Sequence, residues 1–179
     1  MNIIGGEFRG RKLHSPKGDK TRPTSAILRK AVFDICRSEI EGALFLDLFA
    51  GSGAMGLEAL SRGAKLSVFI DKDKNAIQCI KANIAALKLE DQAKVIMGDV
   101  LAALRRLNTH FNIIYIDPPY DLAHLIPKIL DLVVIKNKHA LVFVEEGEPS
   151  SLKIEELTAL RHKDSRKFGN SLLHKFEIL

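Results

Sequence analysis

Short apolar runs alternate with amphipathic stretches along the middle of this chain. The runs predict strands at residues 44–49, 66–70, 93–97, 112–116 and 140–144, and the stretches between them predict helices at 54–62, 74–88, 100–107 and 122–134. Strands that are apolar at nearly every position and are separated by helices are typical of a parallel sheet covered on both faces. The pattern therefore predicts a doubly wound α/β fold.

The two ends of the chain depart from this alternation. Glycine-punctuated apolar pairs predict a short hairpin or arm at the start, and turn signals separate two more runs near the end, which predict two strands antiparallel to each other. We expect one domain with a mainly parallel seven-stranded sheet, which suits a length of 179 residues. Its parts are a basic N-terminal arm (1–23), a leading helix (24–42), a core (43–145), and a C-terminal helix and strand pair (146–179, with strands at 158–163 and 172–179).

The positive charge is concentrated at the ends of the chain. The formal net charge is +5, but residues 1–30 carry +6 and residues 161–179 carry +3, whereas residues 31–160 carry −4. A basic end is typical of a polyanion-binding protein, although an ordinary solvated surface can have the same composition. The longest apolar runs are far shorter than the roughly 20 residues of a membrane span, and the two cysteines lack metal-site or disulfide-framework spacing. We expect a soluble, cytoplasmic protein.

A glycine-rich loop follows the first predicted strand. Gly51, Gly53 and Gly56 form a GxGxxG pattern between a strand and a helix, where the backbone can approach the pyrophosphate of a dinucleotide or parts of S-adenosylmethionine. Asp47 favours the second ligand, because its carboxylate would attract the methionine ammonium and repel a diphosphate. The run from Phe49 to Gly53 is similar to the first motif of class I methyltransferases. A turn that only closes a tight connection remains the alternative.

Acidic residues end the next two strands. Asp71 follows the second strand and can accept hydrogen bonds from both ribose hydroxyls of a nucleoside, with Asp73 as a nearby competitor. Asp99, after the third strand, can pair with an adenine amino group, cap the following helix, or do both. The candidate cofactor-binding residues are Asp47, Phe49, Ala50, Gly51, Ser52, Gly53, Gly56, Asp71, Lys72, Asp99, Val100 and Asp117.

The fourth strand runs into Asp117-Pro118-Pro119-Tyr120. Two prolines stop the strand ladder and fix an extended backbone without N–H groups, so the segment presents acceptors and a ring. The Asp117 carboxylate and the Pro118 carbonyl can each accept one hydrogen of an exocyclic NH₂, and Tyr120 can stack on the base that carries it. Such acceptors localise the nitrogen lone pair toward an incoming methyl group without a strong general base. The four residues are the candidate catalytic set.

At this point the chain resembles a known family. The core resembles amino-directed S-adenosylmethionine methyltransferases with a Rossmann-like class I fold. The whole chain resembles the bacterial RsmD family, on the segments 3–11 (IIGGEFRGR), 22–24 (RPT), 28–33 (LRKAVF) and 166–169 (RKFG). The resemblance implies methylation of the N2 amine of one guanine in 16S ribosomal RNA. It also implies that Asp71, Asp99 and Asp117 to Tyr120 contact ribose, adenine and the target amine; many relatives have glutamate at the position of Asp71.

Several other functions would use parts of the same pattern. An adenine-N6 methyltransferase acting on DNA or RNA would polarise its target amine with the same motif. A sequence-specific DNA enzyme, however, usually needs a larger recognition region. A protein glutamine methyltransferase usually has Asn before Pro-Pro-Tyr and an extra N-terminal domain, and pyrimidine C5 methylation needs a cysteine nucleophile. A non-catalytic RNA-binding protein would not need the intact motifs, and an NAD-dependent oxidoreductase explains neither Asp47 nor Asp117.

The expected substrate is 16S ribosomal RNA or the assembling small ribosomal subunit. The target guanine must reach Asp117, so it has to be flipped out or presented in a loop. We expect a monomer with no metal and no membrane contact. The candidate phosphate-binding residues are Arg9, Arg11, Lys12, Arg22, Arg29 and Lys30.

Overall fold

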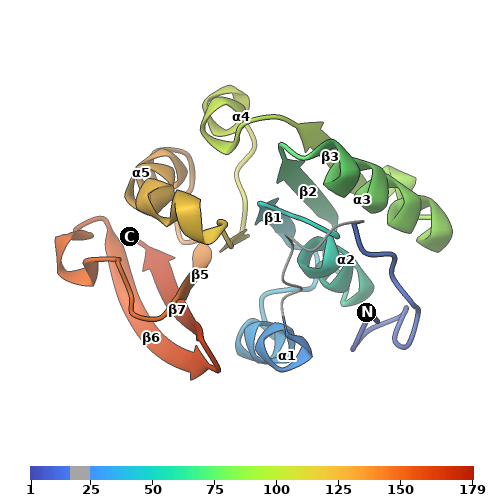
Figure 1. Cartoon of the computed structure of the whole chain (residues 1–179), viewed down its shortest axis with the longest axis horizontal. Helices are drawn as coiled ribbons and strands as arrows, with labels where there is room; N and C mark the ends of the chain where they lie inside the picture. Colours follow the sequence, from blue (N-terminus) through green and yellow to red (C-terminus); the bar gives the residue numbers. More distant parts are fainter. Residues whose placement is uncertain (17–24) are drawn as a thin grey trace.

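A computed structural model describes residues 1–16 and 25–179, and in it a single sheet forms the centre of the molecule (Figure 1). The strands lie in the order β3-β2-β1-β4-β5-β7-β6, with β1 to β5 parallel and β7 antiparallel to both of its neighbours. This confirms the doubly wound, mainly parallel seven-stranded sheet and the antiparallel final pair. The strands are β1 (Leu44–Leu48), β2 (Leu66–Asp71), β3 (Ala93–Met97), β4 (Ile113–Ile116), β5 (Leu141–Gly147), β6 (Leu160–Phe168) and β7 (Ser171–Ile178).

Helices cover both faces of this sheet. They are α1 (Ala26–Ile35), α2 (Ala54–Ser61), α3 (Lys74–Leu87), α4 (Val100–Arg106) and α5 (Ile126–Lys136), with short 3₁₀ segments η1 (Glu90–Gln92), η2 (Tyr120–Leu125) and η3 (Ile154–Glu156). Phe45, Phe69 and Phe143 pack with α1, α2 and α3 on one face. The alternate strand residues pack with α4 and α5 on the other. Every helix in the described ranges is too short or too polar to cross a membrane.

Three predicted helices differ from those observed. The leading helix expected over 24–42 ends at Ile35, because Cys36 leaves helical geometry and turns lead into β1. The stretch predicted as one helix at 122–134 begins as η2, and α5 starts at Ile126 with Pro127 in its first turn. Proline is tolerated there because the N–H groups of the first turn have no acceptor within the helix. The C-terminal helix expected in 146–179 is reduced to the single turn η3. Just before it, Ser150 and Ser151 donate hydrogen bonds to the Glu146 carboxylate, an alternative to helical bonding that suits serine.

The N-terminal segment lies against the body of the protein. Its antiparallel pairing is confined to one bridge, between Asn2 and Lys12, and Ile3 and Leu13 are buried in the core. The amide of Ile4 donates to the Glu58 carboxylate on α2 over 2.8 Å. The described part of the expected arm is therefore an anchored part of the domain.

Candidate active site

The sequence-predicted site residues on β1 to β4 all lie at the carboxyl edge of the sheet. After β1 the chain adds β2 and β3 on one side, then crosses back to place β4 on the other side of β1. In such a sheet the ligand crevice lies at this reversal, beyond the carboxyl ends of the strands. The topology thus brings together groups that are up to 73 positions apart in sequence, from Asp47 to Tyr120.

The glycine loop joins β1 to α2 in the geometry that its sequence predicts. Gly53 has a φ of 77° and immediately precedes α2, and Phe49 has a φ of 61°, which is rare for a residue with a side chain. A Cβ on Gly56 would lie 2.3 Å from Cε1 of Phe69 and 2.4 Å from Oγ of Ser67. The third glycine of the pattern therefore serves the close packing of α2 on β2, and the first two shape the loop.

Asp47 is a buried acid beneath this loop. Its side chain is 2% exposed, and its Oδ2 accepts a 3.0 Å hydrogen bond from the amide of Gly56. Burial raises the pKa of Asp47 to about 8, and the nearby Asp71 charge adds to the shift, against the hydrogen bond from Gly56. A cation placed beside Asp47 would favour its ionised form. The buried Asp47 carboxylate therefore fits a ligand with an ammonium group.

Asp71 ends β2 with its carboxylate turned to the loop. Oδ2 accepts from the amide of Gly51 and Oδ1 accepts from the amide of Asp73, both over 2.8 Å. The competing residue, Asp73, is used instead to cap α3, where its Oδ1 accepts from the amide of Asn75. Lys72 is exposed between them.

Asp99 caps α4, as one of its two predicted roles requires. Its Oδ1 accepts a 2.9 Å hydrogen bond from the amide of Ala102, and the residue stays exposed, while Val100 is buried. A cavity of about 220 Å³ lies beside it, lined in part by Ile96, Gly98 and Arg106. The end of β3 thus combines a carboxylate with a hollow of partly apolar walls.

The Asp117 to Tyr120 segment follows β4 directly. Asp117 is half-buried, Pro118 is buried, and the Tyr120 side chain is 65% exposed at the start of η2. The tyrosine ring lies over the end of β5, because a Cβ on Gly147 would be only 2.5 Å from Cε1 of Tyr120. The ring and the carboxylate are consequently held at the edge of the sheet where the crevice opens.

The end of β5 carries a carboxylate that the sequence motifs do not single out. Glu145 is 8% exposed, and its Oε2 accepts a short hydrogen bond from the hydroxyl of Tyr115 on β4. The signal is present in the sequence, because Glu145 and Glu146 directly follow an apolar strand. The sequence-predicted site positions, however, lie only at the first four strand ends.

The predicted phosphate-binding residues divide into three groups. Arg9, Arg11, Lys12 and Lys30 are exposed, and Lys30 pairs with Asp34. Arg22 lies outside the described residues.

The prediction for Arg29, the third group, is wrong. Arg29 is 1% exposed, donates to the carbonyl of Asn2 over 2.6 Å, and lies 3.7 Å from the Glu58 carboxylate. Helical periodicity places position 29 on the inner face of α1 beside Leu28 and Val32, so this arginine fastens the N-terminus and cannot reach a phosphate.

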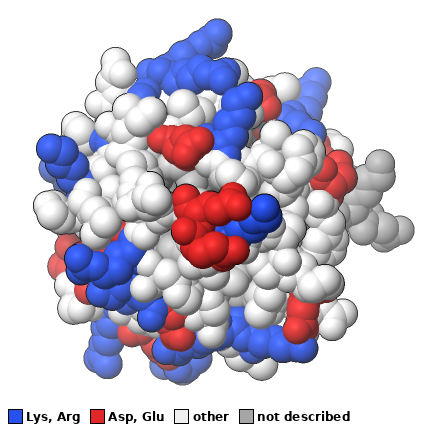
Figure 2. Space-filling view, turned by 90° about the vertical axis from the view of Figure 1, so that its left-hand side faces the viewer, with Lys and Arg blue, Asp and Glu red and all other residues white. Residues whose placement is uncertain are grey.

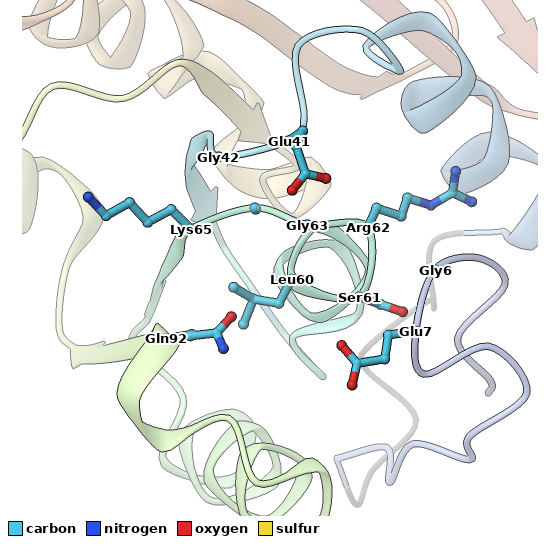
Figure 3. Close-up of a pocket in the computed structure, with 11 residues that line it drawn as sticks. Gly6, Glu7, Glu41, Gly42, Leu60, Ser61, Arg62, Gly63, Lys65 and Gln92 are labelled. Atoms are coloured by element: carbon cyan, nitrogen blue, oxygen red, sulfur yellow. The ribbon is translucent and has the colours of Figure 1, made fainter.

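The described end of the arm lies beside the glycine loop. The buried side-chain amide of Asn83 on α3 donates to the carbonyls of His14 and Ser52, over 3.1 and 3.0 Å. A larger cavity, of about 640 Å³, lies elsewhere, between the arm and the end of α2 (Figure 3). Its lining includes Gly42 and Lys65, which precede β1 and β2, so it opens at the amino edge of the sheet and is separate from the crevice.

The similarity to known proteins extends over almost the whole chain. The family model described as Conserved hypothetical protein 95 matches residues 1–177. The protein named Ribosomal RNA small subunit methyltransferase D is 34% identical in Haemophilus influenzae, over 91% of this chain and 88% of that protein. Its namesake in Escherichia coli is 41% identical over 67% of this chain and 60% of that protein. The solved structure of E. coli yhhF aligns with a TM-score of 0.85 at 30% identity, over 99% of this chain and 97% of that chain.

The fold is that of a class I methyltransferase. The chain belongs to the RsmD family, which the matching model and the methyltransferase D relatives represent. It is a family of S-adenosylmethionine-dependent methyltransferases, so S-adenosylmethionine is the cofactor. A more distant neighbour of the same fold, SMU.776, has a TM-score of 0.70 at 14% identity over 83% of this chain and 48% of that chain, and was solved in complex with S-adenosylhomocysteine.

Proposed function

We propose that this protein methylates the exocyclic N2 amine of a guanine in 16S ribosomal RNA. The relatives' names support ribosomal RNA of the small subunit as the substrate. The observation that carries the chemistry is the position of Asp117 to Tyr120 at the end of the strand that borders the crevice, with the exposed Tyr120 ring over the neighbouring end of β5.

The cofactor supplies an electrophilic methyl group on a sulfonium centre. Asp47 would face its ammonium group, Asp71 its ribose hydroxyls and Asp99 its adenine edge, while residues 49–53, with Gly56 supporting them, bring the backbone close to it. These three acids lie on β1, β2 and after β3, which are adjacent in the sheet. Lys72 and Val100 flank two of the acids, and we assign them to the rim of the same pocket.

The acceptor base would be held by the motif after β4. The Asp117 carboxylate and the Pro118 carbonyl accept the two amine hydrogens, and Tyr120 stacks on the ring. The amine nitrogen then forms its bond to the methyl carbon as the carbon–sulfur bond breaks, S-adenosylhomocysteine leaves, and the nitrogen loses one proton to solvent. Because the cation formed at nitrogen is a strong acid, the residues need to orient and polarise the amine rather than deprotonate it first.

The RNA surface would include the exposed cations of the arm, Arg9, Arg11 and Lys12, whereas the exposed Lys30 on α1 is less suited because it pairs with Asp34. The C-terminal strands are less suited, although they are rich in basic residues. Lys163, Arg166 and Lys167 on β6 each pair with an acid, and Figure 2 shows blue and red side chains interspersed on that side of the molecule.

The experiment that tests this function is methyl mapping. 16S RNA from a strain lacking the protein, before and after incubation with pure protein and S-adenosylmethionine, should differ by one N2-methylguanosine. Transfer to the N6 amine of an adenine would instead support the adenine enzyme, and RNA binding without transfer would support a non-catalytic protein. Naked RNA and assembled small subunits should be compared, since either is compatible with the exposed cations.

A further inference from the structure

The fifth strand end supplies a carboxylate beside the acceptor motif. β4 and β5 are parallel neighbours in register up to the pair Ile116 and Val144, so Asp117 and Glu145 are the next residues on the two strands. Neighbouring strands lie about 4.8 Å apart. Glu145 is therefore the carboxylate next along the sheet edge from Asp117, on the side away from the glycine loop.

Glu145 also points to the same face as the rest of this motif. Side chains two positions apart on a strand share a face, so Glu145 and Gly147 lie on the same face of β5. Tyr115 and Asp117 likewise share a face, because Asp117 precedes a proline and therefore stays extended. The Tyr115 hydroxyl contacts Glu145, and the Tyr120 ring occupies the direction of a Cβ on Gly147. The ring and the two carboxylates thus belong to one face of the neighbouring ends of β4 and β5.

We propose that Glu145 selects guanine by accepting a hydrogen bond from its N1–H, beside the N2 amine held by Asp117. This inference rests on the proposed function and names its specificity residue. Guanine presents two adjacent donors, N1–H and the N2 amine, whereas adenine presents an acceptor at N1 beside its N6 amine. A buried carboxylate therefore binds the first edge and repels the second.

The hydrogen bond from Tyr115 leaves this role open. A carboxylate offers about four lone-pair sites, and the hydroxyl uses one of them on Oε2. The bond fixes the side-chain direction, so that the acceptor is positioned before the base arrives. The adjacent Glu146 cannot share this role, because it faces the other side of β5 and binds His174, Ser150 and Ser151.

Base analogues test the proposal. 16S RNA is ligated to carry guanine or 2-aminopurine at the position found by methyl mapping; 2-aminopurine keeps the amine but has an unprotonated N1. The wild type should prefer guanine by at least about 100-fold in kcat/KM, because the analogue leaves a buried carboxylate facing an acceptor. Glu145→Gln can donate its amide to N1, so the preference should fall at least about tenfold. Glu146→Gln, an equal change on the opposite face, should leave the preference unaltered.

Each outcome decides the proposal. A wild-type preference near one overturns it, even if Glu145→Gln fails to fold. So does a Glu145→Gln preference equal to that of the wild type, which would make Glu145 a support for Tyr115 alone. Because the preference is a ratio for one preparation, partial unfolding of a variant cancels. The absence of any transfer to guanine-containing RNA would instead refute the proposed function, and is recognised before any analogue is used.

Discussion

The amide of Gly51 donates a 2.8 Å hydrogen bond to Oδ2 of Asp71, so the residue that ends β2 orders the loop that follows β1. The other carboxylate oxygen accepts from the amide of Asp73 at the start of the next loop. One side chain thereby couples the part of the pocket assigned to the methionine end with the part assigned to the ribose.

Asp71→Ala should weaken S-adenosylmethionine binding by about 10- to 100-fold, because it removes the charge-assisted hydrogen bond to the loop and those that we propose to the ribose. Isothermal titration calorimetry measures the change. Asp73→Ala is the matched control: it removes the α3 cap, should lower the free energy of unfolding by about 1 kcal/mol, and should leave affinity nearly unaltered. Equal effects of the two changes would contradict the ribose role.

Cofactor binding should release a proton below pH 8. Burial raises the pKa of Asp47 to about 8, so in the free protein the folded state holds a proton that the unfolded state loses near pH 4. The free energy of unfolding should therefore fall as pH rises from about 4 to about 8.

An ammonium group beside Asp47 favours the ionised carboxylate over the protonated one. Cofactor affinity should therefore rise with pH up to about 8, by at most about tenfold per pH unit for one proton. Calorimetry at pH 7 in two buffers of different ionisation enthalpy measures the proton released. Asp47→Asn should bind weakly and release none. Affinity independent of pH in the wild type would place the ammonium elsewhere.

Gly147→Ala should slow methyl transfer at least about tenfold while leaving cofactor affinity unchanged. The new Cβ would clash with the Tyr120 ring, which has to move from the acceptor position. Single-turnover rates measure the loss. When Tyr120 is replaced by alanine, the Cβ added at Gly147 has no ring to clash with. The double variant Gly147→Ala/Tyr120→Ala should therefore be no slower than Tyr120→Ala alone, and additive effects would show that Gly147 acts elsewhere.

Neutralising the arm should reduce RNA affinity and its salt dependence together. Replacing Arg9, Arg11 and Lys12 by glutamine should lower the slope of log affinity against log salt by about 0.7 for each single-strand phosphate that the variant no longer neutralises. Arg29→Met is the control: it removes the charged hydrogen bond to the Asn2 carbonyl and one of the two arginines beside Glu58, whose pair with Arg62 remains, and it should destabilise the fold by about 2 kcal/mol. It should not alter the slope. An unchanged slope in the triple variant would refute the phosphate role.

Most of the fold and four strand ends could be predicted from the sequence, because buried parallel strands and their glycine and proline punctuation are local signals. Arg29 could not be placed by counting charges. Its partner Glu58 lies on another helix, and only tertiary packing brings the two together. The absent C-terminal helix has a similar origin, since the serines after β5 are bound by Glu146.

Glu145 shows a different limit. The sequence places an acid at the end of β5. Its position beside the motif after β4 depends on the sheet order, which makes β5 the neighbour of β4. The motifs assigned to the cofactor and the target base end at Tyr120 along the chain. The contact between Tyr115 and Glu145 extends the candidate site by one strand.

The most direct test of the account is the identity of the methylated nucleoside. 16S RNA is incubated with S-adenosylmethionine carrying a deuterated methyl group, digested, and examined by mass spectrometry for the wild type and for Asp117→Ala. The account predicts labelled N2-methylguanosine with the wild type and at least about a 100-fold loss with Asp117→Ala at nearly unaltered cofactor affinity. Label in any other nucleoside, or equal loss of transfer and cofactor binding in the variant, would contradict it.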